Sequence, residues 1–383
     1  MERGETIELL VDKVVAGGDG LGRADDGRIV MVAGGLPGER VRATLVKVKR
    51  DVGFARVEEI LTPSPDRVAP PCPHVAAGCG GCDWQHVEPA AQARLKREIV
   101  IDAFARIARL PEAPVAPTIE LPATDYRQRV RFLVDRDGHA AFRRAGTNTP
   151  VTIDSCLVLH PRLERMLVDT DWNPSREGEL AYGVNTAETF RTAPTWKHPE
   201  RTGQYHEIVA GHRFTISARS FFQIRTDGAE VLVGLVRSAL GPDVRALADL
   251  YAGVGLFAAT VPAPLVVAIE GNPSAVADLR ENLADHPDAS IHRMPVERWR
   301  AKRTYDAVVA DPSRAGLGPE GVASVLRCAP DRIALVSCDP AAMGRDVRAL
   351  VDAGYRLEVA TPVDLFPMTS HIEVVSALVR AAS

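Results

Sequence analysis

The sequence lacks the features that mark secreted and membrane proteins. Its N-terminus, MERGETIELL, has no apolar segment behind a basic start, so we see no signal peptide. No run approaches the ~18 consecutive apolar residues that a membrane helix needs. Six cysteines in 383 residues are too few for a secreted disulfide scaffold of this size. We therefore expect a cytoplasmic protein, and we expect it to be a monomer.

The sequence also lacks an excess of positive charge. Its 46 lysines and arginines stand against 50 aspartates and glutamates, which gives a formal net charge of -4. This balance argues against a wholly basic nucleic-acid binder but is compatible with one basic face. Arginine far outnumbers lysine, an excess that fits either phosphate contacts or GC-rich coding.

The chain is long enough for two or three domains. Residues 1–62 carry short alternating apolar runs between Gly- and Asp-rich turns, a pattern typical of a small β-barrel or sandwich. Residues 62–71, TPSPDRVAPP, hold four prolines and predict a stiff linker. A helical stretch at about 89–110 and further strands at 126–215 complete a predicted central domain, residues 63–215.

After Ser220 the pattern changes to alternating apolar strands and helices. The strands are ALADLY, PLVVAIE, YDAVVA and RIALVS, with helical segments such as SAVADLRENLAD between them. This rhythm predicts an α/β domain, residues 216–383, with a mostly parallel sheet covered by helices.

A glycine-containing turn, DLYAGVGLFA, closes the first of these strands and opens a helix. Gly253 and Gly255 would let the backbone approach a ligand at the helix N-terminus. Glu270, at the tip of the next strand, is placed to bind ribose hydroxyls. The run also fits G-x-G-x-x-A, so a nicotinamide cofactor is an alternative.

Two more clusters follow strands, and ligand sites in open α/β sheets lie at the carboxyl ends of strands. They are DPSRAG, beginning at Asp311, and SCDP, which contains Cys338. A cysteine at a strand tip is a better candidate nucleophile than Cys328, which we expect to be core filler within VLRCAP.

Cys72, Cys79 and Cys82 lie within eleven positions. Thiols this crowded indicate a metal site, and thiolates suit either zinc or an iron–sulfur cluster. The cysteine spacing that radical S-adenosylmethionine enzymes use for an open cluster is absent.

Taken together, the ordered segments resemble a known family. They are LPGERV, CPH…CGGC…QH, YRQR, FRR followed by IDSC, SFFQ, DLYAGVGLF, DPSRAG, SCDP and HIE. Their order and spacing resemble the S-adenosylmethionine-dependent RNA uracil-C5 methyltransferases with an N-terminal TRAM domain and an iron–sulfur cluster. The resemblance implies an OB-like barrel, a central β-rich domain holding the cluster, and a Rossmann-like catalytic domain.

The resemblance also implies a role for each matching position. Cys338 looks like the nucleophile and Glu373 of HIE like the base. Cys156 of IDSC looks like the fourth ligand of a 4Fe–4S cluster, beside Cys72, Cys79 and Cys82. The residues that look like S-adenosylmethionine contacts are Gln223, Tyr251, Leu256, Glu270 and Asp311. Ser313, Asp339 and Ala252 depart from the usual family pattern.

The resemblance makes RNA the expected partner, either ribosomal or transfer RNA. In YRQRVR the arginines alternate, so on a strand Arg127, Arg129 and Arg131 share one face and could follow phosphates. A solvated sheet face is the alternative. Phe221 and Phe222 could stack on a flipped base or belong to the core. Two other functions remain open: an idle RNA-binding protein on this scaffold, and an iron–sulfur oxidoreductase using a dinucleotide.

Overall fold

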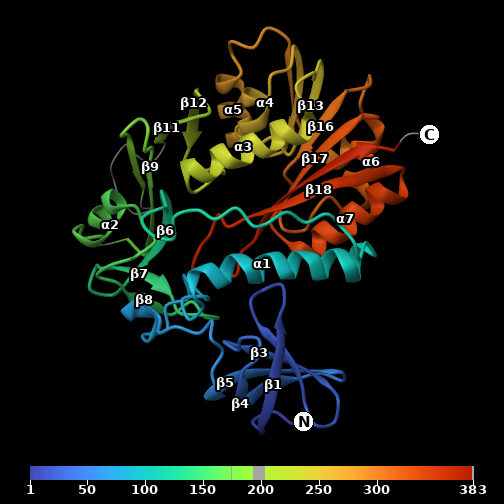
Figure 1. Cartoon of the computed structure of the whole chain (residues 1–383). Helices are drawn as coiled ribbons and strands as arrows, with labels where there is room; N and C mark the ends of the chain where they lie inside the picture. Colours follow the sequence, from blue (N-terminus) through green and yellow to red (C-terminus); the bar gives the residue numbers. More distant parts are fainter. Residues whose placement is uncertain (174, 193–202, 382–383) are drawn as a thin grey trace.

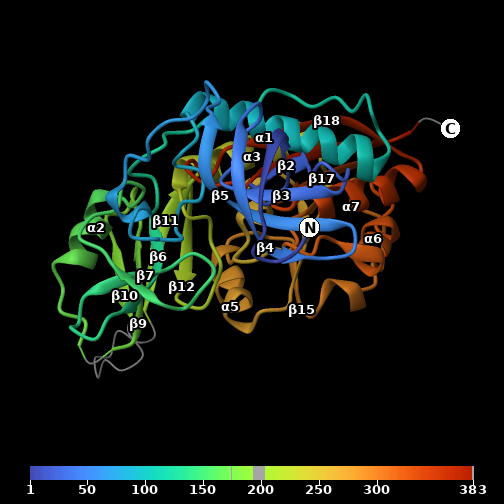
Figure 2. The same cartoon turned by 90° about the horizontal axis from the view of Figure 1, so that it is seen from below.

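The computed structural model describes residues 1–173, 175–192 and 203–381. Figure 1 shows a small barrel lying beneath a long helix, α1, with a helix-covered sheet on the other side of that helix. Figure 2, seen from the barrel side, shows the central β-rich region beside this larger sheet rather than stacked on it. No helix in the described ranges has the length and apolarity that a membrane span requires.

The N-terminal segment forms a closed five-stranded barrel in the order β1-β2-β3-β5-β4. The barrel follows from alternation of side chains: in β4, Val41, Ala43 and Leu45 point inward and are buried, while Arg42 and Thr44 between them are half-buried on the other face. Closure also leaves the barrel without free strand edges. The strands are β1 Thr6–Val14, β2 Gly20–Arg23, β3 Ile29–Ala33, β4 Arg40–Val48 and β5 Val52–Thr62.

The C-terminal sheet has seven strands in the order β15-β14-β13-β16-β17-β19-β18. The first five pair in parallel, and β19 pairs antiparallel with both β17 and β18. The four apolar runs seen in the sequence form four of the central strands, which confirms the predicted sheet. The bounds are β13 Ala246–Leu250, β14 Leu265–Glu270, β15 Ala289–Arg293, β16 Ala307–Ala310, β17 Arg332–Ser337, β18 Tyr355–Val363 and β19 Glu373–Arg380.

Helices cover both faces of this sheet, so its strands are buried on both sides. One core contains side chains of α1, α6 and α7, and Cys328 is fully buried in it, as expected. The other core contains side chains of α3, α4 and α5. The helices are α3 Thr226–Leu240, α4 Leu256–Thr260, α5 Pro273–Asn282, α6 Gly318–Arg327 and α7 Pro340–Asp352.

The central region is a five-stranded sheet in the order β10-β9-β6-β7-β8, with a two-stranded hairpin of β11 and β12. Its core includes Phe132 and Trp172, whose rings meet edge to face at 4.5 Å. The elements are β6 Arg129–Val134, β7 Ala140–Arg143, β8 Pro150–Thr152, α2 Pro161–Val168, β9 Glu177–Tyr182, β10 Thr189–Thr192, β11 Gln204–Val209 and β12 His212–Ser217.

Helix α1, Pro89–Ala103, joins the segment of Cys72, Cys79 and Cys82, here called the cysteine segment with the two residues that follow it, to the C-terminal sheet. The Glu88 side chain accepts a hydrogen bond from the Ala91 amide and caps it. The helix continues as a wider turn, Phe104–Ala108, and ends where Arg109 takes a left-handed conformation. Its fully buried Lys96 donates to Asp364 at 2.6 Å, so an ion pair ties this helix to the loop between β18 and β19.

Candidate active site

One continuous cavity of about 860 Å³ lies between the central sheet and the carboxyl ends of the catalytic strands. It brings together the residues that the sequence suggested for chemistry, cofactor, metal and RNA. Those that line it are Cys72, Cys79, Cys82, Arg127, Arg131, Cys156, Gln223, Tyr251, Gly253, Leu256, Glu270, Asp311, Cys338 and Glu373. Two predicted site residues, Arg129 and Gly255, are not among them.

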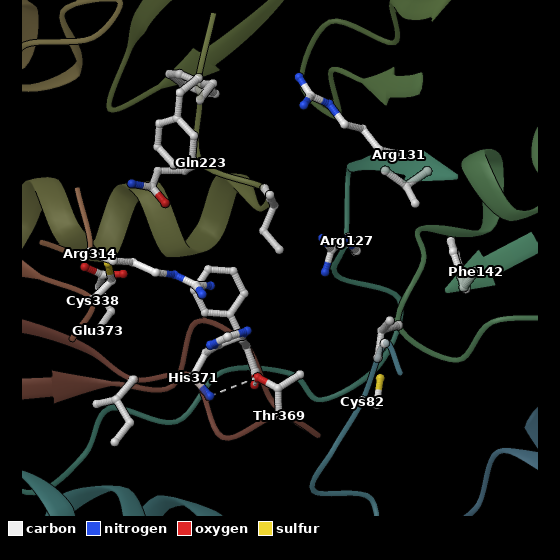
Figure 3. Close-up of a pocket in the computed structure, with 18 of the residues that line it drawn as sticks. Cys82, Arg127, Arg131, Phe142, Gln223, Arg314, Cys338, Thr369, His371 and Glu373 are labelled. Carbon is white, nitrogen blue, oxygen red and sulfur yellow. Dashed lines mark hydrogen bonds between the residues drawn. The ribbon is translucent and has the colours of Figure 1, made fainter. Parts of the chain in front are cut away.

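Cys338 and Glu373 meet because of the register between β17 and β19. Ser337 pairs with Val374 across the antiparallel ladder, so the next pair along is Cys338 with Glu373. Glu373 is buried as the first residue of β19. Figure 3 shows the two side chains together at one end of the cavity, with Arg314 beside them.

Burial and like charge dominate the electrostatics of this end. Burial raises the pKa of Asp311 to about 7. Burial, and then the Asp311 carboxyl, raise the pKa of Glu373 well above its ordinary value. Two such neighbours cannot both ionise easily, so the pair holds a proton at neutral pH.

The Cys338 thiol responds to the same surroundings. Burial raises its pKa to about 11, the carboxyls of Glu373 and Asp311 act in the same direction, and the Arg314 guanidinium opposes them. In the free protein this thiol is therefore protonated near pH 7. Its activation must come from a change in charge around it or from proton transfer.

The glycine turn before α4 has the strained backbone expected beside a ligand. Tyr251 has a φ of 64° and Gly253 a φ of 57°, and no atom lies within 4 Å of a side chain built at Gly253. Glu270 accepts hydrogen bonds from the Gly253 and Asn272 amides, at 2.8 and 2.6 Å. The half-buried turn therefore leaves room for a ligand beside Gly253 and next to the Glu270 carboxylate.

Gly255 has a different task from the one the sequence suggested. A Cβ there would come within 2.6 Å of the Leu279 side chain on α5. Gly255 is therefore required by the packing of the turn on α5, and it does not line the cavity.

The four candidate metal ligands border the other end of the cavity. Burial, with smaller contributions from the neighbouring thiols of Cys156 and Cys79, raises the pKa of Cys82 to about 12. Burial also raises the pKa of Cys156, and Cys72 adds to that shift. All four cysteines line the same cavity, and four thiolates are the donor set that iron–sulfur clusters use.

These thiols do not form a site for a single ion. Within residues 1–173, 175–192 and 203–381, no three His, Cys, Asp or Glu side chains are arranged to hold a metal ion. The predicted cluster therefore stays a prediction.

The three alternating arginines separate into different roles. Arg129 and Arg131 share one face, since both contact Glu179. The Arg129 guanidinium also donates to the backbone carbonyls of Ser220 and Ala218, both at 2.6 Å. Its hydrogen bonds are thus used within the fold. Arg131, whose side chain is 73% exposed, and Arg127 line the cavity.

Phe221 and Phe222, although adjacent in the sequence, differ in exposure. Phe222 is buried and its ring lies 5.6 Å from that of Phe214. Phe221 is 67% exposed and lines the cavity. Phe222 also borders the cavity but is only 4% exposed, so Phe221 offers a ligand the larger surface.

Comparison with known proteins identifies the family. The TRAM domain model matches residues 1–57, and the model described as tRNA (Uracil-5-)-methyltransferase matches residues 299–381. An uncharacterized RNA methyltransferase of Streptomyces avermitilis is 32% identical over 99% of both chains. One from Streptomyces coelicolor is 34% identical and covers 99% of this chain and 94% of its own. The chain belongs to the TRAM-domain RNA (uracil-C5) methyltransferase family.

A solved structure shares the whole fold. Pyrococcus abyssi tRNA (uracil-54, C5)-methyltransferase, in complex with S-adenosyl-L-homocysteine, superposes with a TM-score of 0.73 at 24% identity. The match covers 97% of this chain and 99% of that one, and confirms the small barrel and the methyltransferase sheet. The family resemblance read from the sequence is confirmed.

Membership in this methyltransferase family makes S-adenosylmethionine the cofactor, so the nicotinamide alternative loses its support. Sequence reasoning assigned no role to two residues of the cavity, Arg314 and His371. Each lies inside a segment that the resemblance used, DPSRAG or HIE. Their proximity to Asp311 and to Glu373 in the sequence, respectively, was the available signal.

Proposed function

We propose that this methyltransferase modifies C5 of a uridine in ribosomal or transfer RNA through a covalent adduct between Cys338 and C6 of the base. The observation that carries the proposal is that Cys338 and Glu373, at the ends of the paired strands β17 and β19, line the cavity that also holds the cofactor turn. A nucleophile and a base on adjacent strands are what this chemistry requires.

The first step overcomes the weak nucleophilicity of C5. The Cys338 thiol first releases its proton to water; the thiolate then adds to C6, and the electron pair of the C5–C6 double bond moves into the ring as an enolate. C5 then carries electron density and takes the methyl group. S-adenosylmethionine, when bound, supplies that group as an electrophilic methyl on a sulfonium centre.

The second step restores the ring. After methylation, C5 still carries its proton, and Glu373 in its ionised form accepts it. The electron pair re-forms the C5–C6 bond and expels the Cys338 thiolate. Burial, and then the neighbouring Asp311 carboxyl, raise the pKa of Glu373, so its ionised form is a stronger base than an ordinary carboxylate.

Five residues would hold the cofactor, and all of them border the cavity. The Glu270 carboxylate suits ribose hydroxyls, and Asp311 at the tip of β16 suits a cationic ligand. Gln223, Tyr251 and Leu256 complete the set. The open space beside Gly253 is consistent with a ligand lying against this turn.

RNA would enter from the opposite end. Arg127 and Arg131 face the cavity and offer phosphate contacts, while exposed Phe221 offers a ring for an unstacked base. We include the 4Fe–4S cluster in the proposal, with Cys72, Cys79, Cys82 and Cys156 as its ligands. Its role would be to hold the linker segment against the central domain, with no part in the transfer.

Transfer RNA is supported as the substrate by the names of the similar proteins. The matching family model names a tRNA methyltransferase, and the Pyrococcus abyssi neighbour acts on uracil-54 of tRNA. Ribosomal RNA stays within the proposal.

The test uses transcripts of transfer RNA and large-subunit ribosomal RNA made with uridine or 5-fluorouridine. With uridine and labelled S-adenosylmethionine, mass spectrometry should find 5-methyluridine. With 5-fluorouridine, fluorine blocks the last step, so a methyl-labelled RNA–protein complex should survive denaturing electrophoresis. Absence of 5-methyluridine from both RNAs, or methylation without any trapped complex, would contradict the proposal.

A further inference from the structure

The loop between β18 and β19, residues 364–372, ends at the proposed base and forms part of the cavity wall. Its Thr369 and His371 line the cavity, and Figure 3 shows the bond from the His371 amide to Thr369 Oγ1. Ser370 lies between them and does not line the cavity. It is bonded to Asp83, the residue that follows Cys82.

Asp83 holds Ser370 through both of its carboxylate oxygens. Oδ1 accepts the Ser370 amide at 2.9 Å, and Oδ2 accepts the Ser370 hydroxyl at 2.5 Å. A two-point contact of this kind fixes the orientation of the peptide as well as its position. The residue it fixes is three positions before Glu373.

The neighbouring loop residue, Met368, is strained and is held in the same way. Its φ is 66°, a conformation that is unusual for a residue with a side chain. The Trp84 amide donates to its carbonyl at 3.0 Å, and its own amide donates to Gln92 Oε1 at 2.8 Å. Because such strain persists only where the surroundings enforce it, residues 83–92 determine the shape of this loop.

The N-terminal barrel also contacts Trp84 and the loop between β18 and β19. In the turn between β1 and β2, the Gly18 carbonyl accepts a hydrogen bond from Trp84 Nε1 at 3.2 Å. A Cβ at Gly18 would lie 2.5 Å from the Ser370 Cβ and 2.7 Å from Trp84 Nε1. Gly18, Asp83, Trp84, Met368 and Ser370, here called the loop junction, thus join the barrel, the cysteine segment and the catalytic domain.

We propose that Asp83 and Ser370 are positioning residues, and that the loop junction holds the segment leading into Glu373 in its productive geometry. The inference rests on the proposed function, in which Glu373 removes the C5 proton. It gives the barrel turn and the segment of Asp83 and Trp84 a positioning part in the reaction, in addition to any contact with RNA. Disturbing the junction from any of its three sides should slow the same step.

The barrel supplies a matched pair of variants. Gly17 and Gly18 both have positive φ, 95° and 89°, so alanine strains the turn equally at either position. Only at Gly18 would the new methyl group strike Ser370 and Trp84, since nothing lies within 4 Å of Gly17. We expect Gly18→Ala to lower kcat about tenfold to a hundredfold relative to Gly17→Ala, the effect of misplacing a reacting group by up to about 1 Å.

A second pair probes the junction from the cysteine segment. Asp83→Ala removes the clamp on Ser370. Asp135→Ala removes a similar clamp elsewhere, since Asp135 accepts bonds from Thr152, Asp137 and His139 in a turn outside the cavity. Asp83→Ala should lower kcat like Gly18→Ala, Asp83→Asn should recover part of the loss, and Asp135→Ala should leave kcat unchanged.

The decisive measurement is the amount of covalent RNA–protein adduct that accumulates with ordinary uridine RNA. If proton removal is slowed, Gly18→Ala and Asp83→Ala should build up methyl-labelled RNA–protein adduct, with S-adenosylmethionine affinity unchanged. Equal kcat in Gly17→Ala and Gly18→Ala, or lower melting temperatures without adduct in the Asp83 variants, would overturn the inference. Wild-type protein that forms no adduct with 5-fluorouridine RNA would instead overturn the proposed function.

Discussion

The two ends of the cavity are built in different ways. At the catalytic end, Cys338, Glu373 and Asp311 lie at the tips of neighbouring strands, and sheet register alone places them. At the other end the cysteines come from a linker and from a loop after β8, which no regular element brings together. The first end is therefore set by continuous sheet pairing, whereas the second is held by isolated backbone contacts, such as the bridge between Cys79 and Arg144.

The ends also differ in charge. Carboxyl groups of Glu270, Asp311 and Glu373 surround the catalytic end, which suits a cationic sulfonium cofactor. Arg127 and Arg131 border the far end, which suits an RNA backbone. The comparison indicates how one cavity can accept two ligands of opposite charge, and each prediction below tests one end.

The largest loss of methyl transfer should come from replacing Cys338 or Glu373. Cys338→Ala should form no RNA adduct and transfer no methyl group. Glu373→Gln should still form the adduct but lose about 100- to 10,000-fold in turnover, because the proton on C5 has no base to accept it. Denaturing electrophoresis with labelled cofactor distinguishes the two. Normal turnover of Glu373→Gln would move the role of base to Asp311 or Asp339.

The next largest effect should be a loss of iron and of stability when a candidate cluster ligand is replaced. Anaerobically purified protein should be brown and contain iron and acid-labile sulfide in matching amounts. Cys79→Ser should lose this iron and destabilise the protein by about 1–3 kcal/mol in chemical unfolding. Cys328→Ala, which changes a thiol buried in the core, should keep the iron. Stoichiometric zinc without iron in wild type would rule out the cluster.

A smaller effect is expected from the arginines. Arg127→Ala and Arg131→Ala should each weaken RNA binding and reduce its salt slope by about one, because one fewer counterion is released. Cofactor affinity should not change. Arg129→Ala should instead lower thermal stability, since its guanidinium serves Glu179 and two backbone carbonyls. Unchanged RNA affinity in both cavity variants would favour the solvated-face alternative.

The smallest effect is the pH dependence of Cys338 in the free protein. Its raised pKa, about 11, keeps it neutral at pH 7, so alkylation should accelerate about tenfold per pH unit as the thiolate fraction grows. Arg314→Ala removes a charge that favours the thiolate, so alkylation should slow a few-fold at any pH below that value. Peptide mass spectrometry would follow Cys338 alone. A plateau near pH 8 would contradict the raised pKa.

Much of the fold was readable from the sequence because its signals are local. Apolar runs of strand length gave β13, β14, β16 and β17, and alternating residues gave the barrel. Local signals also marked Cys338 as a strand-tip thiol and Cys328 as core. The pairing of Cys338 with Glu373 came only from the family resemblance, since nothing between these positions predicts that β19 enters the sheet beside β17.

Tertiary structure decided between residues that look equivalent in the sequence. Arg129 differs from Arg131 because Ser220 and Ala218 place carbonyls around it, about ninety positions along the chain. Phe221 and Phe222 differ because only one ring reaches Phe214, and Gly253 and Gly255 because only one faces Leu279. The sequence by itself determined which residue types occur and which elements they form, since periodicity and turn chemistry act over a few neighbours. Which side chains are free for a ligand depended on partners far along the chain, and only the packed structure brings those partners into contact.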